Sequence, residues 1–250
     1  MNTLATSDRN SAEWKTREEL AACYRLVAHM GLEDLTYNHI SARVPGEDAL
    51  LVKPLDYFFR EVTASSLLKF GLDGAPLGGT EKRSPNAIQV LHAAVMLARP
   101  DVGCVMHTHS VANVAVSIQK SGLIPFSQHA LTLYGKVVAH SFLGYEFDLE
   151  MADPLVHDLA NHAVVTLRNH GVLVAERSIG EAYVTHHFYE MACRIQIAAL
   201  AGGTELILLS QSIQAHAARQ VQAIQNVSRS AKDWPACLRL ADDLYASYKD

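Results

Sequence analysis

Residues 97–110 read Leu97-Ala-Arg-Pro-Asp-Val-Gly-Cys-Val-Met-His-Thr-His-Ser110, and this stretch decides how the rest of the chain is interpreted. In a β-strand, the side chains at positions i and i+2 point to the same face. If the apolar run before them is a strand, His107 and His109 present two imidazoles side by side. Neutral imidazole is a good ligand for Zn, Co and Fe ions. The pattern therefore predicts part of a metal site at the end of a strand.

A metal site needs at least one more ligand from another part of the chain. Catalytic zinc sites typically have about three protein ligands and an open position for water or substrate. The best candidate is Asn169-His170-Gly171, which follows an apolar run and in which Gly171 allows a tight turn. Alternatively, His107 and His109 are merely hydrogen-bonded or solvated, because a His-x-His pair arises easily by chance among 13 histidines.

The apolar patterns on both sides of this stretch alternate between strand and helix periodicity, which favours an α/β domain. We expect residues 1–10 to form a flexible tail and residues 11–250 to form a single domain with helices on both faces of a central sheet. Strands are predicted over residues 39–44, 49–53, 102–109, 136–139, 163–168 and 172–175. Helices are predicted over residues 11–31, 85–99, 110–119, 178–203 and 212–226, followed by a C-terminal tail.

Composition excludes several classes of protein. The net charge is -5, so the composition gives no sign of the basic surface that binding to nucleic acids or anionic membranes requires. No apolar run is long enough to span a bilayer, and residues 1–10 contain no apolar segment typical of a signal peptide. The four cysteines form no C-x-x-C pair and are predicted to be buried free thiols. We expect a cytoplasmic protein that acts on a small molecule.

The stretches at residues 97–110 and 167–173 resemble the class II aldolase/adducin superfamily. His39-Ile-Ser-Ala-Arg43 and Ala192-Cys-Arg-Ile-Gln196 are similar to its adducin-like bacterial branch, and the similarity runs from about Trp14 to the C-terminus. The resemblance implies a three-layer αβα fold with a central, largely antiparallel sheet, and a homotetramer with active sites between subunits. It also implies a divalent metal ion, with Zn the first choice and Mn, Co or Fe as alternatives. The metal ligands it implies are His107, His109 and His170.

The chain departs from the sugar-phosphate aldolases of that superfamily in two ways. Alignment through residues 98–102 places Ile88 where those aldolases carry a proton-transferring Glu. Their phosphate ligands correspond to Asn38-His39, Leu55-Asp56 and Asn86-Ala87. Leu55 and Ala87 have no donor side chain, and Asp56 would repel a phosphate. We therefore expect a substrate without a phosphate group.

Other side chains then have to supply the proton transfer and the substrate contacts. His129 follows Pro125 in a loop-like segment and is predicted to be a catalytic acid or a carboxylate-binding group; the alternative is a surface histidine. The resemblance also makes Tyr248 a candidate proton donor to a neighbouring subunit. His39 and Asn86 are expected to line the substrate pocket. Three further polar side chains are interpreted as structural: His92, His186 and Glu190.

The predicted function is that of a metal-dependent lyase in which the ion stabilises the enolate left when a carbon–carbon bond breaks. Our first choice is decarboxylation of a hydroxy-aromatic or heteroaromatic carboxylate, followed by retro-aldol cleavage of a small hydroxy-carbonyl compound. Three neutral ligands also suit Fe(II), so a non-heme iron oxygenase is a second hypothesis. The third is a non-catalytic, adducin-like assembly domain, with which Ile88 is compatible. His129 and the lack of an extended basic tail count against that third hypothesis.

Overall fold

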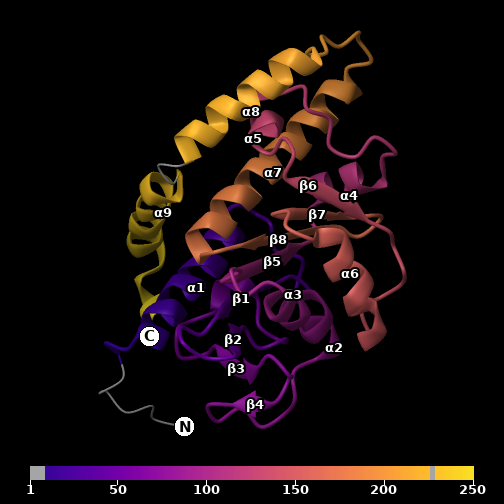
Figure 1. Ribbon diagram of the computed structural model, residues 1–250. Coiled ribbons are helices and arrows are strands. Elements are labelled where there is room, and N and C mark those ends of the chain that lie inside the picture. Colours follow the sequence, from indigo (N-terminus) through magenta and orange to yellow (C-terminus); the bar gives the residue numbers. More distant parts are fainter. Residues whose placement is uncertain (1–8, 226–228) are drawn as a thin grey trace.

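The computed structural model describes residues 9–225 and 229–250 and is built on one eight-stranded sheet (Figure 1). The strand order is β4-β3-β2-β1-β5-β8-β7-β6. Neighbouring strands are antiparallel except for β6 and β7, which are parallel. The strands are β1 (His39–Arg43), β2 (Ala49–Val52), β3 (Leu68–Gly71), β4 (Pro76–Leu77), β5 (Cys104–Thr108), β6 (Val137–His140), β7 (Val164–Leu167) and β8 (Gly171–Glu176). The predicted α/β class with a largely antiparallel central sheet is confirmed.

Helices cover both faces of this sheet. A first apolar core joins α1, α4, α7 and α9 to one face, and a second joins α2, η3, α3 and α6 to the other. Figure 1 shows α1, α7 and α9 on one side of the sheet and α3 and α6 on the other. The helices are α1 (Ala12–His29), α2 (Asn86–Ile88), η3 (Gln89–Ala93), α3 (Ala94–Ala98), α4 (Val111–Ile118), α5 (Gln128–Thr132), α6 (Ala152–Leu159), α7 (Ile179–Ala201), α8 (Gln211–Gln225) and α9 (Arg229–Tyr245).

The alternation of side chains along β5 decides which face carries the predicted metal ligands. Cys104 and Met106 belong to the first core, whereas Val105 belongs to the second. His107 therefore lies on the second face, the side covered by α3 and α6. Thr108 points to the opposite face, where its Oγ1 lies 2.7 Å from Nε2 of His186 on α7. His109 follows immediately after the last residue of the strand.

The predicted helix over residues 85–99 is present, but it differs at its start and in its middle. Pro85 is the extended capping residue before Asn86 rather than the first helical residue. The segments α2, η3 and α3 follow one another without a break, and η3 is a π-helical turn that carries His92. Such turns are rare in proteins, and those that occur are often found at functional sites.

The predicted C-terminal tail is wrong. Residues from Arg229 onward form α9 and a short 3₁₀ turn, η5 (Ala246–Lys249). Pro235 inside α9 breaks the usual helix signal. The helix is stabilised instead by packing on α7. Trp234 lies so close to Gly180 that a Cβ on Gly180 would be 2.5 Å from the indole ring. Residues 1–8 of the predicted N-terminal tail, and residue 226 of the predicted helix before α9, lie outside the described residues.

The cysteines and the helices can be compared with the predictions made from the composition, which were buried free thiols and no segment able to span a bilayer. All four cysteines are free; Cys23, Cys104 and Cys193 are buried and Cys237 is half-buried. Among residues 9–225 and 229–250, none of the helices combines the length and the apolar character that a bilayer crossing needs.

Candidate metal centre

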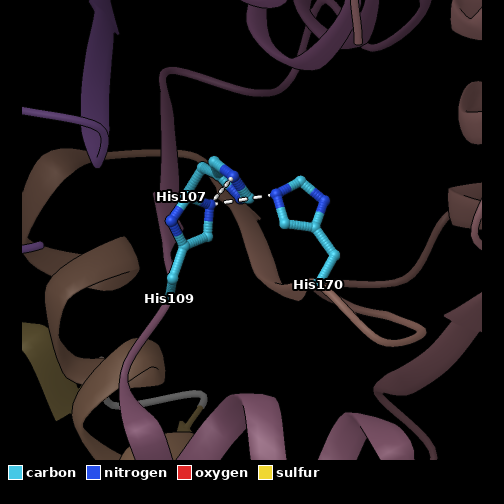
Figure 2. Close-up of side chains that lie close together, drawn as sticks. All are labelled: His107, His109 and His170. Carbon is cyan, nitrogen blue, oxygen red and sulfur yellow. Dashed lines mark hydrogen bonds between the residues drawn. The ribbon is translucent and has the colours of Figure 1, made fainter. Parts of the chain in front are cut away.

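The structure brings His107, His109 and His170 together where the central strand β5 ends and its neighbour β8 begins. His107 lies in β5, His109 just beyond it, and His170 in the turn between β7 and β8. The Nε2 atom of His109 lies 2.7 Å from Nε2 of His107 and 3.0 Å from Nε2 of His170. Figure 2 shows the three imidazole rings directed toward one another. Their ligand atoms all lie within 4.8 Å of one another, close enough for a single ion.

Each of the three rings is held by a hydrogen bond from its other nitrogen. Nδ1 of His107 donates to the Val172 carbonyl, at 3.0 Å. Nδ1 of His109 donates to Asp34, and Nδ1 of His170 donates to Glu146, both at 3.0 Å. Carbonyl and carboxylate oxygens only accept, so the single proton of each neutral ring is on Nδ1. All three Nε2 atoms consequently direct bare lone pairs at one another.

This donor set fits a divalent cation. Lone pairs about 3 Å apart repel one another unless a proton or a cation lies between them, and the Nδ1 contacts leave no proton for the Nε2 atoms. An imidazole ligand whose second nitrogen donates to a carboxylate or carbonyl is the usual arrangement at protein metal sites. His107, His109 and His170 would hold the ion through Nε2, and three protein ligands leave a coordination position for substrate.

Burial favours the neutral, metal-binding form of His107 and His109. Burial lowers the pKa of His107 well below its usual value, and the neighbouring His109 and His39 lower it further. Burial and the nearby His170 also lower the pKa of His109, although Asp34 partly opposes this. Burial alone would raise the pKa of Glu146, but its hydrogen bond and attraction to His170 outweigh that effect and lower it. Glu146 is therefore ionised at neutral pH.

Sequence reasoning missed the three groups that orient the ligands. Asp34 lies in the connection between α1 and β1, and Glu146 in the connection between β6 and α6. Both are remote in sequence from the histidines they contact, and neither belongs to a motif. The third partner, the Val172 carbonyl, is backbone and leaves no trace in the residue type. Asn38 was noted only for its place beside His39, yet its Oδ1 accepts from the His109 backbone N–H at 3.1 Å.

The predicted role of Gly171 as the residue of a tight turn is wrong. The positive φ in this turn belongs to Asn169, at 58°, while Gly171 is the first residue of β8. A Cβ on Gly171 would lie 2.5 Å from the Thr108 carbonyl oxygen and 3.1 Å from the His109 ring. Glycine is needed here because β8 approaches the ligand segment of β5 so closely.

Of the two predicted substrate-binding residues, the structure brings His39 to the histidines. His39 in β1 pairs with His107 in β5, and the two ring centroids are 5.0 Å apart. Asn86 is exposed at the start of α2, where its Nδ2 donates to the Phe147 carbonyl at 2.5 Å. It thereby fixes the connection that carries Glu146, and none of its described contacts joins it to the three histidines.

The two predicted catalytic residues lie elsewhere within the chain. His129 is in the short helix α5 rather than in a loop, because Ser127 caps the helix, and its ring centroid is 5.8 Å from that of Phe188 on α7. Tyr248 is 2% exposed and its hydroxyl donates to Asp242 at 2.6 Å. In the described part of one chain, neither contacts the histidines. Ile88 is fully buried in the second core.

The polar residues interpreted as structural are all buried. Glu190 on α7 accepts from Ser110 Oγ and from Arg194 Nε, which fixes the residue after the second ligand. His186 contacts Thr108 from the first face of the sheet. His92 contacts His39, at 2.7 Å between ring nitrogens, and so belongs to the surroundings of the metal centre.

Replacing Glu146 with Gln should weaken metal binding by about tenfold to a hundredfold, the usual cost of losing an outer-shell partner. Gln keeps the shape but removes the negative charge that polarises His170. The dissociation constant can be measured by competition with a zinc chelator. Glu150→Gln is the matched control, because Glu150 is exposed in the same connection. Equal affinities for the two variants would contradict a supporting role for Glu146.

Comparison with known proteins places this arrangement in a family. The family model described as "Class II Aldolase and Adducin N-terminal domain" matches residues 18–197. The chain belongs to the class II aldolase and adducin family. The resemblance predicted from the sequence is thus confirmed, and this family includes metal-dependent lyases.

Relatives in this family include bacterial proteins of similar length and the adducins. A putative aldolase class 2 protein of Pseudomonas aeruginosa is 38% identical over 243 residues, which are 96% of this chain and 94% of that protein. The crystal structure of an aldolase II superfamily protein from Pseudomonas syringae has a TM-score of 0.92 and 39% identity, covering 98% of this chain and 99% of that one. Alpha-adducin of Rattus norvegicus is 38% identical over 218 residues, which are 84% of this chain but 30% of the adducin.

Proposed function

We propose that this class II aldolase family member is a metal-dependent decarboxylase of hydroxy-aromatic or heteroaromatic carboxylates that lack a phosphate group. The observation that carries the proposal is the convergence of three Nε2 lone pairs, each fixed by an acceptor on Nδ1. A divalent ion held there, Zn in our first choice, supplies positive charge for the electron pair left when a carbon–carbon bond breaks.

The surroundings support a substrate without phosphate. Leu55 and Asp56 are exposed and offer no cationic or N–H side chain to an anion. The amide of Asn86 is engaged with the Phe147 carbonyl. His39, beside His107, offers a single imidazole nitrogen and not the cluster of donors that a phosphate requires. Carboxylate and hydroxyl oxygens match this small set of donors better.

Decarboxylation also requires a proton for the carbon atom that loses carbon dioxide. We assign the donor to a neighbouring subunit of a homotetramer, and we favour His129 over Tyr248. His129 is half-buried, whereas Tyr248 is buried and its hydroxyl is already bonded to the exposed Asp242. An exposed apolar side chain next to the centre supports an assembly of this kind: Val111, which begins α4 two residues after His109, is 88% exposed.

The free thiols are in keeping with a reducing compartment such as the cytoplasm.

The proposal is tested by assaying the purified protein, loaded with Zn, Mn or Co, against hydroxybenzoates, heteroaromatic carboxylates and small hydroxyketones. We expect metal-dependent release of carbon dioxide from a carboxylate and loss of this activity after chelation. Cleavage of a hydroxyketone without carbon dioxide release would replace decarboxylation by retro-aldol chemistry. Oxygen uptake by anaerobically purified, iron-loaded protein would indicate an oxygenase. A protein that binds no metal and turns over none of these compounds would favour an adducin-like assembly role.

A further inference from the structure

Three buried polar side chains form a hydrogen-bonded chain that ends beside the metal centre. Nδ1 of His39 lies 2.7 Å from Nε2 of His92, and Nδ1 of His92 lies 2.7 Å from Oγ of Ser41. His92 and Ser41 are completely buried, whereas His39 is 6% exposed. This series of hydrogen bonds is therefore closed to water at Ser41 and reaches the surface of the site at His39.

The direction of these hydrogen bonds follows from the serine. His92 is the one partner of the Ser41 hydroxyl within the described residues. If Ser41 accepted a proton from His92, its own O–H would be buried without an acceptor, which is the costlier arrangement. Ser41 therefore donates to Nδ1 of His92. Burial lowers the pKa of His92 to about 3, so the ring is neutral and carries its single proton on Nε2.

The same reasoning fixes the proton of His39. Nε2–H of His92 donates to Nδ1 of His39, so a neutral His39 carries its proton on Nε2. The buried side-chain polar atoms without a partner in the described residues are Ser84 Oγ and Asn113 Oδ1. Nε2 of His39 also has no hydrogen-bond partner in the described part of the chain, but it is not one of these two buried atoms. It therefore belongs to the exposed part of the ring. A solvent-facing N–H donor thus lies on the ring that packs against His107.

We infer that Ser41 and His92 are positioning residues that lock His39 as a hydrogen-bond donor, and that its Nε2–H binds an oxygen of the substrate beside the three histidines. The π-helical turn η3 carries His92 to the face of the sheet shared by His39, Ser41 and His107. A fixed donor selects carboxylate, hydroxyl or carbonyl oxygens and disfavours a group that can only donate. The substrate contact rests on the proposed function, whereas the direction of the hydrogen-bonded chain does not.

The direction is tested by NMR of protein labelled with ¹⁵N in histidine, which distinguishes a protonated from a bare ring nitrogen. In the zinc-loaded wild type we expect His39 to be protonated at Nε2. Ser41→Ala should give a mixture of the two His39 tautomers. Ser117→Ala is the matched control, because Ser117 is also completely buried but donates to the Val114 carbonyl in α4. A wild-type His39 protonated at Nδ1 would overturn the inference, and this result can be obtained even if Ser41→Ala fails to fold.

The contact with substrate is tested with glycolate, a small probe with adjacent hydroxyl and carboxylate oxygens, titrated into cobalt-loaded protein and followed by visible absorption. Ser41→Ala should raise the dissociation constant of glycolate by about tenfold, the cost of one weakened hydrogen bond to a charged group. Its affinity for cobalt, and both affinities of Ser117→Ala, should match the wild type. An unchanged glycolate affinity in Ser41→Ala would refute the substrate contact. Failure of the wild type to bind cobalt would instead refute the metal centre, and the NMR result would still decide the direction of the chain.

Discussion

Replacing His107 and His109 together with Ala should abolish stoichiometric metal binding and lower turnover by about a thousandfold or more. The expected loss corresponds to the several kcal/mol that a bound ion contributes to stabilising a transition state. Only His170 remains of the three converging ligands, and a single imidazole does not retain a divalent ion against a chelator. Metal content after dialysis and turnover of the best substrate from the carboxylate screen are the two measurements.

A matched double variant separates this effect from the general cost of removing histidines. His157→Ala with His216→Ala removes two exposed imidazoles, on α6 and α8, and should keep wild-type metal content and turnover. His107 is buried, so the melting temperature of the ligand variant must also be recorded. Turnover that survives in a folded, metal-free ligand variant would disprove the metal-dependent lyase.

Replacing Gly171 with Ala should weaken metal binding by about tenfold or more, the scale on which lost support of a ligand acts. The new methyl group would lie 2.5 Å from the Thr108 carbonyl oxygen and 3.1 Å from the His109 ring. Relief of these contacts requires β8 to move away from β5, which separates His170 from His107 and His109. Forcing a methyl group into such a position also costs about 1–3 kcal/mol of stability.

Gly103 provides the control at the opposite end of the same strand pair. A Cβ on Gly103 would clash in a similar way with the Arg177 carbonyl oxygen, and Gly103 precedes the first residue of β5, at the end opposite the histidines. Gly103→Ala should therefore lower the free energy of unfolding without changing the affinity of the folded protein for zinc. Chemical denaturation and chelator competition measure the two quantities. Equal zinc affinities in the two variants would show that the close approach at Gly171 does not support the site.

Periodicity was enough to predict the centre of the molecule. The i, i+2 rule places His107 and His109 beside one another only if the preceding run is a strand, and β5 is such a strand. The capping serines Ser110 and Ser178 likewise mark the starts of α4 and α7, because their hydroxyls accept from backbone N–H groups in the first turn. These signals are local, so they can be read from a single sequence.

The parts that could not be predicted depend on contacts between distant segments. The carboxylates of Asp34 and Glu146 become functional only when their connections fold onto His109 and His170. The helical character of α9 conflicts with Pro235 and is recovered by packing on α7. His92 was interpreted as structural because one histidine on an apolar helix face carries no information about the strand it will meet.

The two carboxylates that orient the ligands have a consequence for how this site can diversify. Asp34 and Glu146 lie on separate connections outside the sheet, while the histidines lie on or beside its strands. Mutations in either connection can change the basicity of one ligand, and with it the preferred ion and the acidity at the open position, while the three histidines stay in place. A lineage can therefore drift toward a new metal or a new reaction through its loops, or lose catalysis altogether, and still keep an intact histidine triad.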